Sequence, residues 1–306
     1  MNVCYVFPGQ GSQKVRMGKQ LYEAYPDARR IFKTGNDILG RDITDLIFNG
    51  SEEELKKTVN CQPAMLIVNM AYHSALKDKI LPSYVLGHSL GEYSALVAAD
   101  SLSLEDALRL VKIRAELVSQ CIPDEELEEK TSHMAAVITD NHELVYSTCD
   151  IVRSGIGVVQ VANINSPAQI VISGNNKAVI SVVEYLQDKG VKSIYLPVEG
   201  PYHSDLMISA ADGLGDALRE VEIRRPNISF IPNVSAEPVS DPGEIRRLLK
   251  EQVYNTVRWS ESIERVIREG AEVFIESGPG KVQNRLIKRN YKQVRVIDAD
   301  GVIGES

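Results

Sequence analysis

An apolar strand pattern that runs into the turn sequence GHSLG at 87–91 constrains this chain more than any other feature. The strand pattern covers 84–86, and a helical pattern at 92–99 follows the turn. Glycines two positions before and two after a serine let the backbone turn sharply without a Cβ clash. We therefore predict a nucleophile elbow that exposes the Ser89 hydroxyl, with the Leu90 N–H facing a developing oxyanion. The alternative is an ordinary tight turn.

The rest of the chain alternates short apolar strands with amphipathic helices, which is typical of an α/β fold with a mainly parallel sheet. The N-terminal sequence MNVCYVFPGQGS has no basic region and only a short apolar run, so we expect a buried first strand and not a secretory signal or membrane anchor. After the middle of the chain we expect a strand at Ile228–Ile231, a helix after Pro242, a strand at Val273–Glu276 and a final helix.

The middle of the chain has a different pattern, strand-helix-strand-strand-helix-strand. The expected elements are the strands 133–139, 158–164, 168–173 and 192–198 and the helices 141–153 and 175–189. This βαββαβ order predicts a ferredoxin-like subdomain with two helices on one face. The predicted fold is thus a large α/β-hydrolase-like domain, residues 1–130 and 199–306, plus a small ferredoxin-like subdomain, residues 131–198.

Composition excludes several classes of function. A net charge of -8 disfavours nucleic acid or an anionic membrane as partner, because phosphate binding needs a dominant basic field. The four cysteines are widely spaced and have no clustered histidines, which argues against a zinc site and a disulfide framework and favours a reducing cytoplasm. The acidic run Asp124–Glu129 could suggest a metal site, but without histidine partners it is better interpreted as a solvated loop or helix start.

A serine hydroxyl needs a nearby base at neutral pH. Five histidines are present, and His203 is distinguished by its Gly-Pro loop, EGPYHS, where the chain returns to the large domain and a cleft is expected. His88 is adjacent to the nucleophile but should point elsewhere. By position alone, His203 is as well explained as a surface loop residue.

The Gly-rich loop after the first strand offers a further oxyanion donor. It lacks the Lys-Ser/Thr of a P-loop and the third glycine of a dinucleotide fingerprint, which disfavours nucleotide binding. A backbone N–H of Gln10 is the better use for this loop.

Several motifs together resemble the malonyl-CoA:acyl-carrier-protein transacylase family. They are FPGQGSQ at 7–13, GHSLGE at 87–92, ANINSPAQIVISG at 162–174 and GPYHS at 200–204, in the order and spacing of the family. An arginine in VKIRA, Arg114, and a glutamine in EQVYNTVRW, Gln252, agree as well. The resemblance covers nearly the whole chain.

The resemblance implies a role for each matching residue. Ser89 would be the acylated nucleophile, His203 its general base, and the N–H groups of Gln10 and Leu90 the oxyanion hole. Gln252 would help to orient His203, and the histidine would be held by a backbone carbonyl, which makes a dyad and not a triad. Arg114 would clamp the malonyl carboxylate, since a guanidinium offers two parallel donors. Without the resemblance, Arg114 would be interpreted as a helix-surface charge.

The implied reaction is ping-pong transfer of a malonyl group from malonyl-CoA, through a seryl ester, to the phosphopantetheine thiol of an acyl carrier protein in fatty-acid or polyketide synthesis. Coenzyme A enters as a thioester substrate, and no bound cofactor or metal is expected. The family default is a monomer.

Some positions depart from the family pattern. Ser132-His133 stands where a pair of small residues is usual, and Asp100 stands where a glycine often follows the alanines. The acidic run before Ser132 is also longer than usual. We therefore expect the entrance to the site to differ from that of the family. Tyr202 stands where phenylalanine is frequent, and a bulky aromatic would crowd an α-methyl group, which favours malonyl over methylmalonyl.

Two other functions fit parts of this pattern. An acyl hydrolase that edits acyl carrier proteins would keep the fold and dyad but use water, and it would gain nothing from Arg114. A non-catalytic module that docks carrier protein would have lost the nucleophile or the base, and both are present. An acidic carrier protein would need a local basic patch on this acidic chain. The candidate residues are Lys281, Arg285, Lys288, Arg289, Lys292 and Arg295. The alternative interpretation of these residues is a solvated helix face with no docking role.

Overall fold

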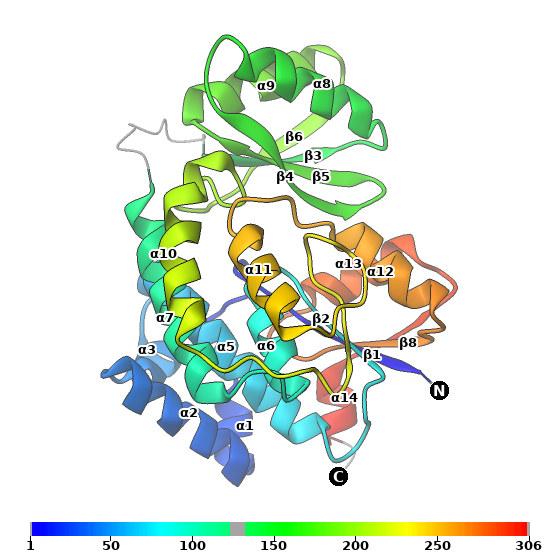
Figure 1. The fold of residues 1–306 in the computed structure, drawn as a ribbon. Helices are drawn as coiled ribbons and strands as arrows, with labels where there is room; N and C mark the ends of the chain where they lie inside the picture. Colours follow the sequence, from blue (N-terminus) through cyan, green and yellow to red (C-terminus); the bar gives the residue numbers. More distant parts are fainter. Residues whose placement is uncertain (1, 123–131, 305–306) are drawn as a thin grey trace.

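The computed structural model, which describes residues 2–122 and 132–304, contains two separate β-sheets (Figure 1). The larger sheet has five strands in the order β7-β2-β1-β8-β9, and every neighbouring pair is parallel. Its strands are β1 (Val3–Phe7), β2 (Tyr84–Gly87), β7 (Ser229–Phe230), β8 (Val273–Glu276) and β9 (Arg295–Ile297).

Helices cover both faces of this sheet, which explains why β1 is buried along its whole length. Successive side chains of a strand point to opposite faces. Tyr5 and Phe7 accordingly belong to one apolar core, with the helices α5 (Thr58–Leu76), α6 (Gly91–Ala98) and α7 (Leu104–Gln120). Cys4 and Val6 belong to a second core, with α12 (Trp259–Arg268) and α13 (Val282–Asn290). The expected parallel α/β sheet and buried first strand are confirmed.

Local sequence signals account for several helix starts. The Ser103 hydroxyl accepts the Asp106 N–H at the start of α7, and the Asp241 carboxylate accepts the Glu244 N–H at the start of α11, where Pro242 occupies the first turn. The helices of the larger part are α1 (Lys19–Ala24), α2 (Pro26–Leu39), α3 (Ile43–Asn49), α4 (Glu52–Lys56), α5 (Thr58–Leu76), α6 (Gly91–Ala98), α7 (Leu104–Gln120), η1 (Asp205–Met207), α10 (Ile208–Arg219), α11 (Pro242–Gln252), α12 (Trp259–Arg268), α13 (Val282–Asn290) and α14 (Ala299–Gly304).

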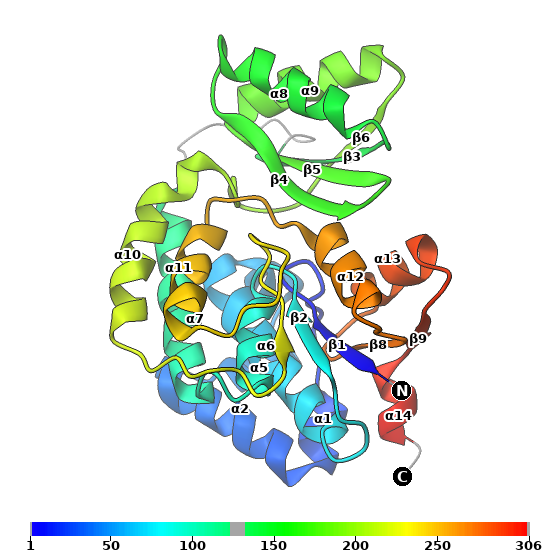
Figure 2. The same ribbon diagram turned by 45° about the vertical axis from the view of Figure 1, so that its right-hand side comes forward.

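The second sheet has four antiparallel strands in the order β4-β5-β3-β6, which is the ferredoxin-like arrangement. Two helices pack on one of its faces, at the top of Figure 2. The elements are β3 (Met134–Ile138), α8 (His142–Arg153), β4 (Val159–Ser166), β5 (Gln169–Gly174), α9 (Asn176–Asp188) and β6 (Lys192–Tyr195). The predicted βαββαβ order is therefore confirmed.

The differences from prediction lie at the ends of elements. The last strand of the small sheet ends at Tyr195 and not at Val198, and neither the short edge strand β9 nor the helix α14 after α13 was predicted. The domain boundaries at 131 and 198 stay a prediction. The acidic run Asp124–Glu129 lies outside the described residues.

Main-chain hydrogen bonds join strand β4 of the small sheet to the part of the chain that carries the large sheet. The Ile164 N–H donates to Val257 O at 2.9 Å, and the Val257 N–H donates to Ala162 O at 2.8 Å, which extends the small sheet by one isolated bridge. This junction brings strand β4, at the edge of the small sheet, onto the loop that follows the carboxyl end of β2, where Asn165 contacts His88. Ligands bind at the carboxyl ends of the strands in open α/β sheets.

In the part of the chain that the structure describes, no helix is long and apolar enough to cross a bilayer.

Candidate active site

The predicted elbow is present between β2 and α6. Ser89 has φ +51°, a left-handed conformation that costs a non-glycine residue free energy and persists only where the surroundings enforce it. The surroundings here leave no room for side chains beside it. A Cβ on Gly87 would lie 1.9 Å from the Gly91 carbonyl carbon, and one on Gly91 would lie 2.1 Å from Phe7 O. The two glycines therefore allow the strand, the turn and α6 to pack this closely.

His203 is the partner of Ser89. Ser89 Oγ and His203 Nε2 are 2.7 Å apart, and His203 Nδ1 is 2.7 Å from the main-chain oxygen of Gln252. A carbonyl only accepts, so the proton of the neutral ring lies on Nδ1 and Nε2 is free to accept from the serine hydroxyl. A serine and a histidine in this tautomer have the geometry of a nucleophile and its general base.

The environment of His203 keeps its ring neutral. Burial, followed by the neighbouring Arg114 cation, lowers the pKa of His203 to about 3. A base that is neutral at every ordinary pH is ready to take a proton without first losing one.

Arg114 is buried, not exposed on a helix surface, and lies beside the dyad. Helix α7 carries it inward with only 4% of its surface exposed. Its Nη1 donates to Gln62 Oε1 at 2.8 Å, and its Nη2 donates to both Ser89 Oγ and Gln252 Oε1 at 3.2 Å. Its Nε–H is buried and has no acceptor among the described residues. A buried, unmatched donor is costly, so this guanidinium is suited to an anionic group that arrives with a ligand.

Gln252 contacts both His203 and the groups around it. The contact to the ring comes from the main-chain carbonyl of Gln252. Its side chain instead accepts from Arg114 and donates to Ser89 O at 2.8 Å and Glu92 Oε2 at 2.7 Å. One glutamine thereby ties the base, the elbow and the guanidinium together.

Glu92 and Asn233 complete the support of the elbow. Asn233 Oδ1 accepts the Ser89 N–H at 2.8 Å, and Asn233 Nδ2 donates to Gly87 O at 2.7 Å. The Asn233 N–H in turn donates to Glu92 Oε1. Burial raises the pKa of Glu92 to about 8, so this carboxyl is largely protonated at neutral pH and serves as a hydrogen-bonding support.

The candidate oxyanion donors, Leu90 and Gln10, lie on two adjoining loops. The N–H groups of Leu90 and Gln10 donate no hydrogen bond to another group in the described part of the chain. The loop that carries Gln10 packs tightly on the elbow, since a Cβ on Gly9 would be 2.5 Å from His88 O and 3.7 Å from Leu90 N. Two free N–H groups from adjoining loops can point to one oxygen.

A second polar cluster joins the loop of Gln10 to the loop of His203. The Tyr202 and Thr58 hydroxyls are 2.5 Å apart, and Gln10 Nε2 donates to Thr58 Oγ1 at 3.3 Å. The Glu199 carboxylate accepts the Thr58 N–H at 2.6 Å, at the start of α5. Two loops distant in sequence are therefore fixed to the start of one helix.

The structure places Ser89, His203, Arg114 and Gln252, which the sequence analysis singled out, within hydrogen-bond distance of one another. The sequence analysis did not single out Gln62 or Asn233. Gln62 had a signal, because it interrupts the apolar run of α5, a helix buried over most of its length. A polar residue in such a helix needs a buried partner. Asn233 had a weaker one, its position shortly after β7 at the carboxyl edge of the sheet.

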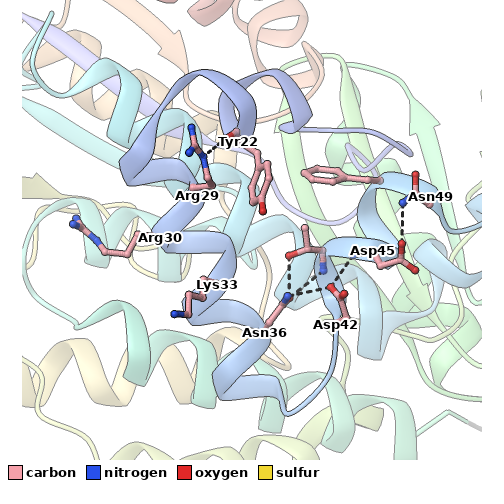
Figure 3. A pocket seen from close by; sticks show the side chains of 10 residues that line it. Tyr22, Arg29, Arg30, Lys33, Asn36, Asp42, Asp45 and Asn49 are labelled. Atoms are coloured by element: carbon pink, nitrogen blue, oxygen red, sulfur yellow. Dashed lines mark hydrogen bonds between the residues drawn. The ribbon is translucent and has the colours of Figure 1, made fainter.

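A pocket of about 550 Å³, separate from the residues described above, lies between α2 and α3 (Figure 3). Its polar groups bond mainly to one another, as when Asn36 contacts both Asp42 and Thr44. Among the described residues its lining side chains make no hydrogen bond to the dyad or to Arg114, and no group of three or more potential metal ligands occurs. Its lining residues are Tyr22, Arg29, Arg30, Lys33, Asn36, Asp42, Thr44, Asp45, Phe48 and Asn49.

Comparison with known proteins identifies the family of this chain. The family described as acyl transferase domain matches residues 4–306. The chain belongs to this acyl transferase family. A curated relative from Bacillus subtilis (strain 168), named malonyl CoA-acyl carrier protein transacylase, is 41% identical over 297 residues, which are 96% of this chain and 92% of that protein.

Solved structures of the acyl transferase family have the same fold. An acyl-carrier-protein-S-malonyltransferase from Bartonella henselae aligns with TM-score 0.92 and 39% identity over 99% of this chain and 98% of that one. A type II PKS acyl-carrier protein in complex with its malonyl-transacylase provides a second match, with TM-score 0.93 and 34% identity over 100% of both chains. The predicted fold class and family resemblance are thus confirmed.

Proposed function

We propose that this acyl transferase moves a malonyl group from malonyl-CoA to the phosphopantetheine thiol of an acyl carrier protein through an ester on Ser89. The observation that carries the proposal is the buried Arg114 guanidinium 3.2 Å from the Ser89 oxygen. In a malonyl ester the free carboxyl carbon is three bonds from that oxygen, within reach of the same guanidinium. The names of the relatives, malonyl transacylases, support the same substrate.

In the first half-reaction, Ser89 Oγ attacks the thioester carbonyl while His203 Nε2 takes the hydroxyl proton. The negative oxygen that forms accepts hydrogen bonds from the N–H groups of Gln10 and Leu90. When the C–S bond breaks, the proton on His203 passes to the sulfur, and coenzyme A leaves as a thiol. The histidine is thus base first and acid second.

In the second half-reaction the same groups act in the reverse direction. His203 takes the proton of the phosphopantetheine thiol, and the sulfur attacks the malonyl ester. Collapse of the intermediate releases Ser89, which recovers its proton from the imidazolium. The carboxylate on Arg114 holds the acyl group in one orientation through both halves. Coenzyme A serves only as the thioester carrier of the substrate, and the proposal requires no bound cofactor.

Arg114 also separates this proposal from the editing hydrolase. A hydrolase that clears varied acyl groups gains nothing from a buried guanidinium, whose desolvation is costly. A transferase that selects a dicarboxylic unit recovers that cost when the substrate carboxylate binds. Tyr202, held by its hydroxyl against Thr58, would resist displacement by an α-methyl group and so favour malonyl over methylmalonyl.

The deciding experiment offers the purified protein malonyl-CoA, methylmalonyl-CoA and acetyl-CoA, with and without a phosphopantetheinylated carrier, and follows enzyme and carrier by intact mass. We expect a malonyl ester on the enzyme and its transfer to the carrier. Rapid release of free acid from acetyl-loaded carrier would make the protein a hydrolase instead. Peptide mapping of the ester tests the assignment to Ser89.

The pathway context follows from the acceptor. An acyl carrier protein occurs in fatty-acid and type II polyketide synthesis, and the matched complex contains a carrier of the latter kind. We propose a cytoplasmic, monomeric enzyme for either role, since its substrates are a soluble thioester and a small carrier protein.

A further inference from the structure

We infer that strand β4 of the small subdomain is a positioning element for catalysis, and that Gln160 and Asn165 hold the two catalytic loops in register. This inference rests on the proposed function, because it assigns a role in the reaction of Ser89 and His203. The small subdomain would then be part of the catalytic apparatus and not only a wall of the cleft.

Gln160 holds the loop of the base. Its Oε1 accepts the Asp205 N–H at 3.1 Å, and its Nε2 donates to Tyr254 O at 3.2 Å, with a longer contact of 3.5 Å to His203 O. Tyr254 follows shortly after Gln252, whose carbonyl orients the imidazole. One side-chain amide therefore links both main-chain segments that set the position of the ring.

Asn165 holds the loop of the nucleophile through His88. Asn165 Oδ1 is 2.9 Å from His88 Nε2, and because an amide oxygen only accepts, the imidazole donates. Gln169 fixes the amide by accepting from Asn165 Nδ2 at 3.2 Å. The ring of His88 also packs edge-on to Trp259, with centroids 5.3 Å apart. His88 precedes Ser89 directly, so fixing its ring restrains the strained turn.

Two irregularities in β4 make this double contact possible. Residues five apart in a regular strand point to opposite faces of the sheet. The pairing of β4 with β5 skips Ala162, between Val161 and Asn163, and skips Asn165, between Ile164 and Ser166. Each skipped residue is a β-bulge, and bulges re-aim side chains near active sites.

The burial of the flanking residues agrees with this change of face. Val161 packs in the core under α8 and α9, on the face away from the catalytic domain. Ala162 belongs to another cluster, with Val171, against which Tyr202 packs. After the first bulge Asn163 has Val171 as its partner, so the strand again presents polar side chains toward the catalytic loops.

The test compares rates of acylation in the presence of malonyl-CoA, measured by rapid quench and intact mass. Gln160→Met removes every polar contact at nearly constant volume. We expect its acylation rate constant to fall about 10- to 100-fold, since small displacements of reacting groups have effects of this size. The apparent KM for malonyl-CoA should change much less. Gln187→Met, an exposed change in α9 of the same subdomain, is the matched control.

Two further pairs of variants separate positioning from simple destabilisation. Asn165→Leu should slow acylation, whereas Asn165→Asp keeps an acceptor for His88 and should recover much of the rate. Gln160→Glu introduces a carboxylate beside the main chain of His203, which should stabilise the imidazolium and move the acid limb of the acylation profile to higher pH. Recovery by Asn165→Asp is the readout that a merely structural residue would not give, because it depends on the acceptor for His88.

Each outcome assigns the failure to one proposal. If the wild-type protein forms no malonyl ester, the proposed function fails, and the positioning role that rests on it is overturned as well. If the wild-type ester forms normally and Gln160→Met and Asn165→Leu acylate at the wild-type rate, the positioning role is wrong. A lowered melting temperature with an unchanged rate per folded molecule would overturn it equally.

Discussion

The Arg114 guanidinium lies 3.2 Å from the hydroxyl oxygen of Ser89, close enough to donate a hydrogen bond to the nucleophile itself. Burial and, after it, the same cation lower the pKa of His203. A carboxylate that binds Arg114 would offset this charge and make the imidazole a stronger base. Substrate binding and activation of the base are thereby linked through one side chain.

Replacement of Ser89 by alanine should abolish the acyl-enzyme. No other hydroxyl among the described residues lies within hydrogen-bond distance of His203 Nε2. Intact mass after incubation with malonyl-CoA would reveal the missing adduct. Ser119→Ala, a change in α7 outside both catalytic loops, is the control and should acylate normally. An adduct on Ser89→Ala would show that the nucleophile is another residue.

Replacement of Arg114 by alanine should change selectivity more than it changes the chemistry. Hydrogen bonds to a charged group contribute about 1.5–3 kcal/mol each, so losing two should lower kcat/KM for malonyl-CoA by about a hundredfold or more. Acetyl-CoA has no carboxylate to lose and should be affected far less. Arg109→Ala removes an exposed arginine of the same helix, paired with Asp106, and serves as the control.

The pH profile should report the buried state of His203. Its pKa of about 3 keeps the free enzyme's base neutral, so kcat/KM for malonyl-CoA should stay nearly flat between pH 7.5 and 5. In Arg114→Ala the cation is gone, the pKa of His203 rises, and an acid limb should move to higher pH. A wild-type limb near the ordinary histidine pKa would contradict this.

Glu92 should make the protein less stable as pH rises. Its folded pKa of about 8 exceeds the ordinary value of 4.5, so between these values the unfolded chain has lost the proton that the folded chain keeps. Stability from this group is therefore full below pH 4.5 and is lost toward pH 8. Denaturant unfolding at pH 5 and pH 8 should show a steeper loss for the wild type than for Glu92→Gln, by about 1 kcal/mol or more. Equal losses would argue that Glu92 is ionised in the fold.

The sequence was sufficient for the fold class and for the elbow of Ser89 because both depend on local patterns, whereas His203 was singled out as the base only by the family resemblance. The elbow needs only a strand, two glycines and a helix, and the βαββαβ unit needs only alternating periodicity. The support of the site was not predictable in this way. The contacts of Asn233 with the elbow and of Gln160 with the base loop join residues far apart in the chain, and only tertiary packing brings them together. The bulges of β4 were not predictable either. A bulge shifts which side chains point to each face of the sheet, but the alternation of polar and apolar residues in the sequence does not show where an extra residue is inserted.

Charge reversal on α13 should raise the KM for the carrier protein and leave the rate of acylation by malonyl-CoA unchanged. The six basic residues that follow β8 are exposed, and within the described chain only Lys281 among them forms an ion pair, with Asp298. Arg285 and Arg289 are four residues apart on one helix and thus share a face. An acidic carrier would meet this face through long-range attraction, which is sensitive to salt. In Arg285→Glu/Arg289→Glu we therefore expect a several-fold higher KM for the carrier, a flatter dependence of that KM on ionic strength and an unchanged acylation rate with malonyl-CoA.

The control is the same charge reversal at Arg30 and Lys33 of α2, which line the pocket of Figure 3. It alters the net charge equally and should leave the KM for the carrier unchanged. If both double variants raise the KM alike, net charge and not the α13 face governs carrier binding.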